Sequence, residues 1–164
     1  MGSERVRITV VLDAGPIIHL DQIDSLELLS AFDKLILPEK VHEEVSAGDM
    51  PSEMEKLELE RVEAEDTEDF DNLDEGESSG LSIARNIDDV VFLTDDLEAR
   101  QRAKELGIEV HGSVGVVAFG FRRGKLDFDE AADKMRALQE ETDLFITDAV
   151  VERGIEMLEE LSDN

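Results

Sequence analysis

Two short apolar runs, each followed directly by acidic residues, constrain the fold of this chain more than any other feature. One run is Val6–Leu12, which is rich in β-branched residues and precedes Asp13, and the other is Val90–Thr94, which precedes Asp95 and Asp96. Because both runs are mainly apolar rather than regularly alternating, they predict strands that are buried on both faces. Such strands are typical of parallel sheets covered by helices on two sides.

Helical patterns alternate with strand patterns along the chain. Gly15 and Pro16 end the first strand, and Pro16 suits the first turn of a helix. Amphipathic spacing and capping residues predict helices at about 15–23, 25–32, 38–47, 75–87, 96–106, 128–140 and 148–161, with further strands at about 34–37, 57–62 and 108–110. A Gly-rich turn with Gly112 and Gly115 is expected to lead into one more helix, which ends near Arg123 and Gly124. This order predicts an α/β fold of three layers, α/β/α, around a central, mostly parallel sheet.

The chain of 164 residues is long enough for one hydrophobic core, so we expect a single domain over 1–164. Within it we expect an acidic excursion at about 49–74 and two C-terminal helices at about 128–161. Cysteine is absent, which excludes disulfides and thiolate chemistry. No apolar run approaches the roughly 20 residues that span a bilayer, and the N-terminus lacks a secretory pattern, so we predict a soluble cytoplasmic protein without a membrane partner.

The formal net charge is −27, from 43 acidic and 16 basic residues. High net charge favours disorder, but 41% hydrophobic residues in periodic segments can build a core. We therefore interpret the composition as a folded domain with an acidic coat. Such a coat suits a protein that works in multimolar salt, where charges are screened within about 3 Å. The same coat makes each single carboxylate less diagnostic of function.

Acidic residues recur where the carboxyl ends of parallel strands meet, which is where α/β sheets place their sites. Asp13 and the Asp95–Asp96 pair hold such positions. On the predicted helices, Glu44 lies about 60° from Val41, and Glu77 lies about 40° from Leu81, so both border buried faces.

Carboxylates that converge without matching Lys or Arg would repel one another unless a divalent cation lay among them. Oxygen ligands without cysteine favour Mg²⁺ or Mn²⁺, which activate water and stabilise charge at a phosphodiester. The alternative is that Asp13 and Asp96 only cap helices and that Glu44 and Glu77 are surface acids.

The histidines and the arginines carry weaker signals. His19, His42 and His111 show no ligand spacing, so structural or exposed roles are expected. Arg100 follows Asp96 by one helical turn, where it could pair with a site acid or contact a substrate phosphate.

Five segments in order resemble the PIN domain, a small metal-dependent ribonuclease fold that includes VapC-type toxins, and the resemblance is closest to its stand-alone branch with two extra C-terminal helices. The segments are VVLDAGPII, LPEKVHEEV, LDEGESSGLSIA, VFLTDDLEARQRAKELGI and GSVGVV, within a match from about Ile8 to Leu158. The resemblance implies a PIN-like fold and, with the acidic composition, a source in a halophilic archaeon. Many relatives carry a hydroxyl residue near the first acid, where this chain has Ala14–Gly15.

Carried over to this sequence, the resemblance implies catalytic acids at Asp13, Glu44, Glu77 and Asp96. The same residues would bind Mg²⁺ or Mn²⁺, with Asp95 able to share or replace the role of Asp96, and Arg100 would contact the substrate.

Three functions are weighed. The leading one is a divalent-metal-dependent endoribonuclease that cleaves RNA phosphodiesters by metal-activated water. The second is a non-catalytic PIN-like module that binds RNA or has a regulatory role and is held by a partner protein. Besides the RNA substrate, the partners considered are an antitoxin or regulatory protein and, because PIN relatives are often dimers, a second copy in a homodimer. The third is a receiver-like domain, which is disfavoured because no later strand end supplies the Thr or Ser and the Lys that phosphoryl chemistry requires.

Overall fold

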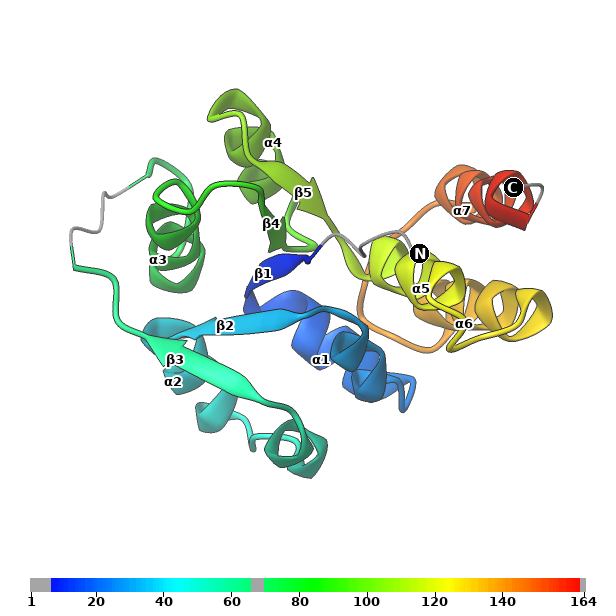
Figure 1. Cartoon of the computed structure of the whole chain (residues 1–164), viewed down its shortest axis with the longest axis horizontal. Helices are drawn as coiled ribbons and strands as arrows, with labels where there is room; N and C mark the ends of the chain where they lie inside the picture. Colours follow the sequence, from blue (N-terminus) through cyan, green and yellow to red (C-terminus); the bar gives the residue numbers. More distant parts are fainter. Residues whose placement is uncertain (1–6, 66–69, 163–164) are drawn as a thin grey trace, which may run out of the picture.

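The structure, a computed structural model, describes residues 7–65 and 70–162. Its helices lie around a central sheet (Figure 1). The strands are β1 (Thr9–Leu12), β2 (Lys34–Pro38), β3 (Leu59–Val62), β4 (Val90–Leu93) and β5 (Glu109–His111). The helices are α1 (Ala14–Gln22), α2 (Glu39–Ala47), α3 (Glu75–Ala84), α4 (Leu97–Glu105), α5 (Ser113–Arg122), α6 (Phe128–Glu140) and α7 (Asp148–Ser162), with the 3₁₀ helices η1 (Leu26–Ala31) and η2 (Ser52–Lys56).

The sheet has five strands in the order β3-β2-β1-β4-β5, and all four pairings are parallel. β1 lies at its centre, with Val11 opposite Ile36 of β2 and Phe92 of β4. The parallel order brings the carboxyl ends of β1 and β4 to the same edge, with Leu12 opposite Leu93. This arrangement confirms the predicted α/β fold with a parallel central sheet.

The sheet separates two hydrophobic clusters, because successive strand side chains point to opposite faces. Val10 and Leu12 belong to the larger cluster, with residues of α1, α5 and α6. Val11 and Phe92 belong to the other cluster, with residues of α3 and α4. The two helical layers lie on opposite sides of the strands in Figure 1. The central strands are therefore buried on both faces, as their mainly apolar sequences predict.

The segment after α1 differs from its predicted form. Residues 26–31 form the 3₁₀ helix η1 instead of an α-helix, and Phe32 is already extended. The Ser25 hydroxyl does not cap this helix but donates to the Ile23 carbonyl oxygen at 2.9 Å. Short 3₁₀ helices commonly serve as connectors, and the leucines of this one still face the core.

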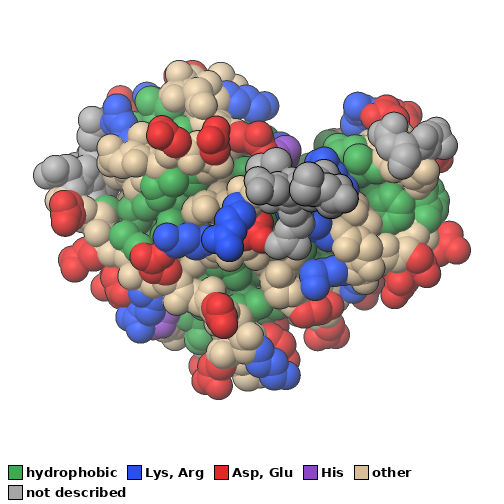
Figure 2. Space-filling view, in the orientation of Figure 1, with side chains coloured by type: hydrophobic (Ala, Val, Ile, Leu, Met, Phe, Trp, Pro, Cys, Tyr) green, Lys and Arg blue, Asp and Glu red, His purple; other side chains and the backbone are tan. Residues whose placement is uncertain are grey.

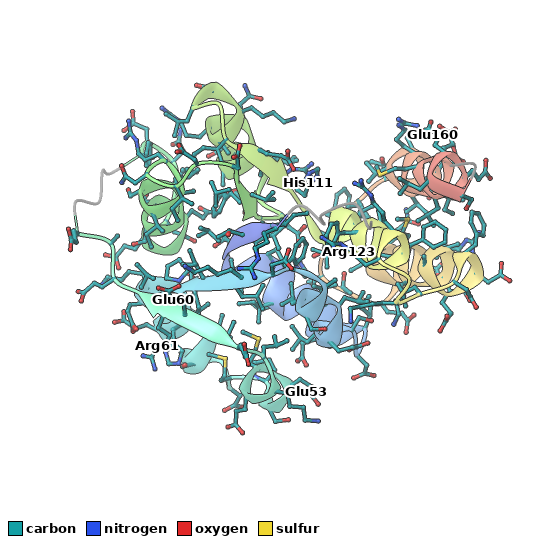
Figure 3. The ribbon with its side chains drawn as sticks, viewed as in Figure 1. Glu53, Glu60, Arg61, His111, Arg123 and Glu160 are labelled. Atoms are coloured by element: carbon teal, nitrogen blue, oxygen red, sulfur yellow. The ribbon has the colours of Figure 1, made fainter. Side chains whose placement is uncertain are left out.

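The acidic stretch at 49–74 contains both η2 and the edge strand β3, although residues 66–69 lie outside the described part of the chain. Acidic side chains are spread along the outline of the face shown in Figure 2. The labelled Glu60 and Arg61 lie on β3 (Figure 3), where Glu60 pairs with Lys34 at 2.9 Å and Arg61 pairs with Glu39 at 2.9 Å. Exposed charges of both signs thus cover this edge of the sheet, which discourages pairing with another strand.

The helices at the C-terminal end of the chain pack beside α5, and α7 lies against α6 (Figure 1). They bury Met135, Leu138 and Leu158 in the larger cluster. Over residues 7–65 and 70–162, no helix is long and apolar enough to cross a membrane.

Candidate active site

A cavity of about 250 Å³ opens at the carboxyl ends of β1 and β4. Apart from His19, every ionisable side chain that lines it is a carboxylate. The lining residues are Asp13, Ala14, Gly15, His19, Glu44, Asp74, Glu77, Asp95, Asp96, Asp143, Leu144 and Phe145. We call this cavity the acidic pocket.

Asp13 is the buried centre of the acidic pocket. Its backbone N–H donates to the Leu93 carbonyl oxygen at 2.9 Å, which fixes the end of β1 beside β4. Its carboxylate accepts bonds from the Ala14 N–H at 2.8 Å and from the Thr94 hydroxyl at 2.6 Å. Asp13 is therefore the N-cap of α1 and a pocket acid at the same time.

Burial, with smaller contributions from the charges of Asp74 and Glu44, raises the pKa of Asp13 to about 7 despite the lowering effect of its two hydrogen bonds. An acid only 5% exposed thus has a negative charge that the protein alone does not compensate.

Glu77 enters the acidic pocket from the first turn of α3. It forms a capping box with Asp74, in which the Glu77 N–H donates to Asp74 at 2.8 Å and the Asp74 N–H donates to Glu77 at 3.0 Å. Burial raises the pKa of Glu77 to about 8, with further contributions from a hydrogen bond to Asp96 and from the charges of Asp13 and Asp74. The side chain is 7% exposed, so it is not the surface acid of the alternative interpretation.

Glu44 reaches the pocket from α2 and is exposed, in contrast to the buried Asp13 and Glu77. The space that a Cβ atom would occupy at Gly76 lies 3.0 Å from the Glu44 Oε1 atom, so the missing side chain of Gly76 leaves room for this carboxylate. Partial burial and the charge of Asp74 raise the pKa of Glu44. Glu44 thus lies over the first turn of α3, close to the start of the helix that carries Glu77.

Asp95 and Asp96 follow β4 but have different environments. Asp95 accepts bonds from the Ser113 N–H at 2.7 Å and the Ser113 hydroxyl at 2.6 Å, and it lies 2.7 Å from the Nδ1 atom of His19. Asp96 is the N-cap residue of α4, yet its side chain makes no capping bond. Asp95 therefore joins α1 and α5 to the end of β4, whereas the Asp96 side chain contacts Glu77.

All five predicted metal ligands line the acidic pocket, which brings acids of β1, α2, α3 and the β4–α4 junction together. Arg100 is half-buried and is not among the lining residues. A Cβ atom added at Gly112 would lie 3.5 Å from the Arg100 Nη1 atom and 2.5 Å from the Asp95 Oδ1 atom. The Arg100 guanidinium and the Asp95 carboxylate thus both lie beside Gly112, and the guanidinium is at the periphery of the site.

Sequence reasoning missed Asp74, His19 and the residues 143–145. Asp74 lies three residues before Glu77, and this spacing is the sequence pattern of a capping box, so it could have been recognised. His19 had no such signal, because its partner Asp95 is far away in the sequence. Residues 143–145 belong to the loop between α6 and α7, whose position depends on how these helices pack.

In the described parts of the chain, no three Asp, Glu or His side chains are arranged to hold a metal ion. Both oxygens of Asp13 and of Asp95 accept the hydrogen bonds described above, which orient the two carboxylates.

Comparison with known proteins agrees with this architecture. A family model described as PIN domain matches residues 9–160. The chain belongs to the PIN-domain family. Its acidic pocket lies at the end of the PIN sheet where β1 and β4 finish, and the family includes nucleases.

A solved PIN structure of similar fold is a PilT N-terminus domain protein from the hyperthermophilic archaeon Sulfolobus solfataricus P2. It shares 17% sequence identity and has a TM-score of 0.56, with 68% of this chain and 92% of that chain covered. No curated protein sequence matches the chain. At this identity the structural likeness supports the PIN fold alone.

Proposed function

We propose that this PIN-domain protein is a divalent-metal-dependent endoribonuclease that cleaves RNA phosphodiesters in the cytoplasm. The observation that carries the proposal is the acidic pocket, in which the buried Asp13 lies among further carboxylates while no Lys or Arg of the described chain lines the cavity. Such a site concentrates negative charge that must be compensated before it can accept a phosphodiester.

The donor set fits Mg²⁺ or Mn²⁺, which prefer carboxylate oxygens. Asp13, Glu44, Glu77 and Asp96 would hold the cation, because they come from different elements and share one cavity. When bound, such an ion lowers the pKa of a water molecule and stabilises the charge that develops on the phosphate. The raised pKa values of Asp13 and Glu77 agree with carboxylates that lack a cationic partner.

The other residues of the site orient these acids. Thr94 and the N–H of Ala14 fix both oxygens of Asp13, and the capping box fixes Glu77. Asp95 is proposed as a positioning residue, since Ser113 and His19 already engage its oxygens. Arg100 is proposed to contact a substrate phosphate from the edge of the site.

The test compares Asp13→Asn with Asp127→Asn. Both residues are helix N-caps, but Asp127 is exposed at the start of α6, outside the acidic pocket. Asparagine caps almost as well as aspartate, so a purely capping role predicts that both variants behave like the wild type. We expect Asp13→Asn alone to lose calorimetric Mn²⁺ binding and cleavage of a single-stranded oligoribonucleotide. Unchanged metal binding in Asp13→Asn would overturn the metal site.

A second candidate function is a non-catalytic PIN module that binds RNA or regulates, held by an antitoxin-like protein or by a second copy of the chain. It is favoured by the arrangement of the pocket, where no three of the described Asp, Glu or His residues are set to hold an ion. Wild-type protein that binds RNA but cleaves none with either metal would establish this alternative.

A further inference from the structure

Phe145 presents an almost fully exposed aromatic ring at the rim of the acidic pocket. Its side chain is 96% exposed, and it lines the cavity together with Asp143 and Leu144. We propose that this ring stacks on a nucleobase of single-stranded RNA and thereby holds the strand beside the carboxylates. The proposal rests on the proposed function, since it names the contact by which that site would recognise its substrate.

The loop that carries Phe145 is anchored on both sides of it. The Gln22 side chain of α1 donates to Asp143 at 2.9 Å and accepts from the Asp143 N–H at 3.3 Å. After Phe145, Gln139 donates to the Ile146 carbonyl oxygen at 3.1 Å. Leu144 and Ile146 pack against the larger hydrophobic cluster, whereas Phe145 between them points into solvent.

This anchoring reduces the entropy cost of a contact at Phe145, because the backbone is already fixed before a ligand arrives. The exposed ring of Phe145 is therefore held in position for a contact by a loop whose backbone is already fixed.

Phe145 is the most exposed large hydrophobic side chain in the described part of the chain. In the described residues, the large hydrophobic side chains that are exposed are Ile18, Leu97, Phe145 and Val150. Ile18 precedes the pocket residue His19, and Leu97 follows the pocket residue Asp96. Of these four exposed side chains, Phe145 is the one that lines the acidic pocket, where it can meet a base of a strand bound beside the carboxylates.

The charge of the molecule explains why stacking is the suitable contact. A protein with a net charge of −27 repels the RNA backbone, and no Lys or Arg of the described chain lines the pocket to bind phosphates. Phosphate contacts also weaken steeply as salt rises. Stacking of bases on aromatic rings does not depend on phosphate charge and is available when bases are unpaired. Single-stranded RNA fits this rim better than a duplex.

The absence of Trp and Tyr allows a direct test. In Phe145→Trp the new indole is the only one in the chain, and stacking on a base should quench its fluorescence. We expect quenching when a single-stranded oligoribonucleotide is mixed with this variant and Mg²⁺ in a stopped-flow instrument, and much less quenching with an abasic oligonucleotide. Val150→Trp places the same reporter at another exposed apolar position and should respond little.

Steady-state cleavage provides the second measurement. Phe145→Ala and Phe145→Leu should raise KM between about 5-fold and 100-fold with kcat little changed, whereas Phe145→Tyr should resemble the wild type. Val150→Ala serves as the matched control and should leave KM unchanged. If Phe145→Leu keeps the wild-type KM, the ring acts only as apolar surface, and the stacking proposal is wrong.

The two proposals fail in different ways. If the wild type cleaves no RNA while Phe145→Trp is still quenched by the intact oligonucleotide, the nuclease is lost and the stacking contact stands. If cleavage is normal but quenching is absent and Phe145→Ala changes the sedimentation of the protein, the ring contacts protein rather than RNA, and this inference is overturned.

Discussion

Asp13 shows how one residue can satisfy two interpretations of a sequence. It caps α1 through the Ala14 N–H, as the structural alternative predicts, and it is buried among acids, as the metal-site interpretation predicts. The cap does not explain the burial, since an exposed aspartate would cap equally well. What distinguishes Asp13 is the energetic cost of its charge in this pocket.

This cost predicts a dependence of stability on pH. The pKa of Asp13 is about 7 in the folded protein and 3.8 for an unperturbed aspartate. Below about pH 4 the group is protonated in both states. Between about pH 4 and 7 the unfolded chain has lost this proton while the folded protein keeps it, so the free energy of unfolding falls as pH rises, by on the order of 4 kcal/mol in total.

In the presence of a chelator, the wild type should therefore lose more stability between pH 5 and pH 8 than Asp13→Asn, because residue 13 of the variant cannot titrate while Glu77 titrates in both proteins. Mn²⁺ should restore more stability to the wild type at pH 8 than at pH 5, because the ion binds the ionised acid. An equal pH response in both proteins would contradict the assigned role of Asp13.

The residues also show where prediction from sequence ends. Asp13, Glu44 and Glu77 could be placed at one site because strand ends and helix periodicity fix their directions locally. The sequence could not distinguish Asp95 from Asp96, since the difference lies in Ser113 and His19, which only the fold brings to Asp95. Phe145 was missed for the same reason.

At the scale of elements, the predictable parts are those with local causes. β1 and β4 follow from mainly apolar runs, and α6 follows from the periodicity of its sequence and its cap at Asp127. η1 was predicted as an α-helix because its leucines fit helical spacing, but a segment of six residues packed on the core can also meet that pattern as a 3₁₀ helix. Short segments are decided by packing and not by periodicity.

The capping boxes of α3 and α6 form a matched pair of elements. Asp74 with Glu77 and Asp127 with Glu130 use the same hydrogen bonds, but only the first pair lines the acidic pocket. Asp74 raises the pKa values of Asp13, Glu44 and Glu77 through its charge. The first turn of α3 therefore adds to the repulsion that a cation would relieve.

This comparison predicts that Asp74→Asn stabilises the protein in chelator at pH 8 by roughly 1 kcal/mol, or about 2–4 °C in melting temperature, because the cap remains while a like charge is removed. Asp127→Asn should be nearly neutral under the same conditions. With saturating Mn²⁺ the advantage of Asp74→Asn should shrink, since the lost charge also attracted the ion. Identical melting shifts for the two variants, with and without metal, would argue against a shared electrostatic pocket.

At the scale of the whole molecule, the acidic coat opposes folding through repulsion among its charges. Ion pairs such as Lys34 with Glu60 and Arg153 with Glu160 lie on the surface, with the labelled Glu60 and Glu160 at separate edges of the molecule (Figure 3). Exposed pairs of this kind contribute little to stability, and 16 basic residues cannot neutralise 43 acidic ones. The compact state must therefore depend on screening by salt.

We predict that the melting temperature in 3 M KCl exceeds that in 0.1 M KCl by roughly 10 °C, because screening that returns a few kcal/mol shifts a domain of this size by that amount. A melting temperature that is equal or higher at low salt would refute the dependence.

The way in which the melting temperature rises with salt concentration identifies the cause of the stabilisation. The screening length falls from about 10 Å at 0.1 M to about 3 Å at 1 M, so repulsion should be relieved mostly below about 1 M. A rise that continues steadily from 1 M to 3 M would instead indicate exclusion of salt from the protein surface, which strengthens apolar burial whatever the net charge.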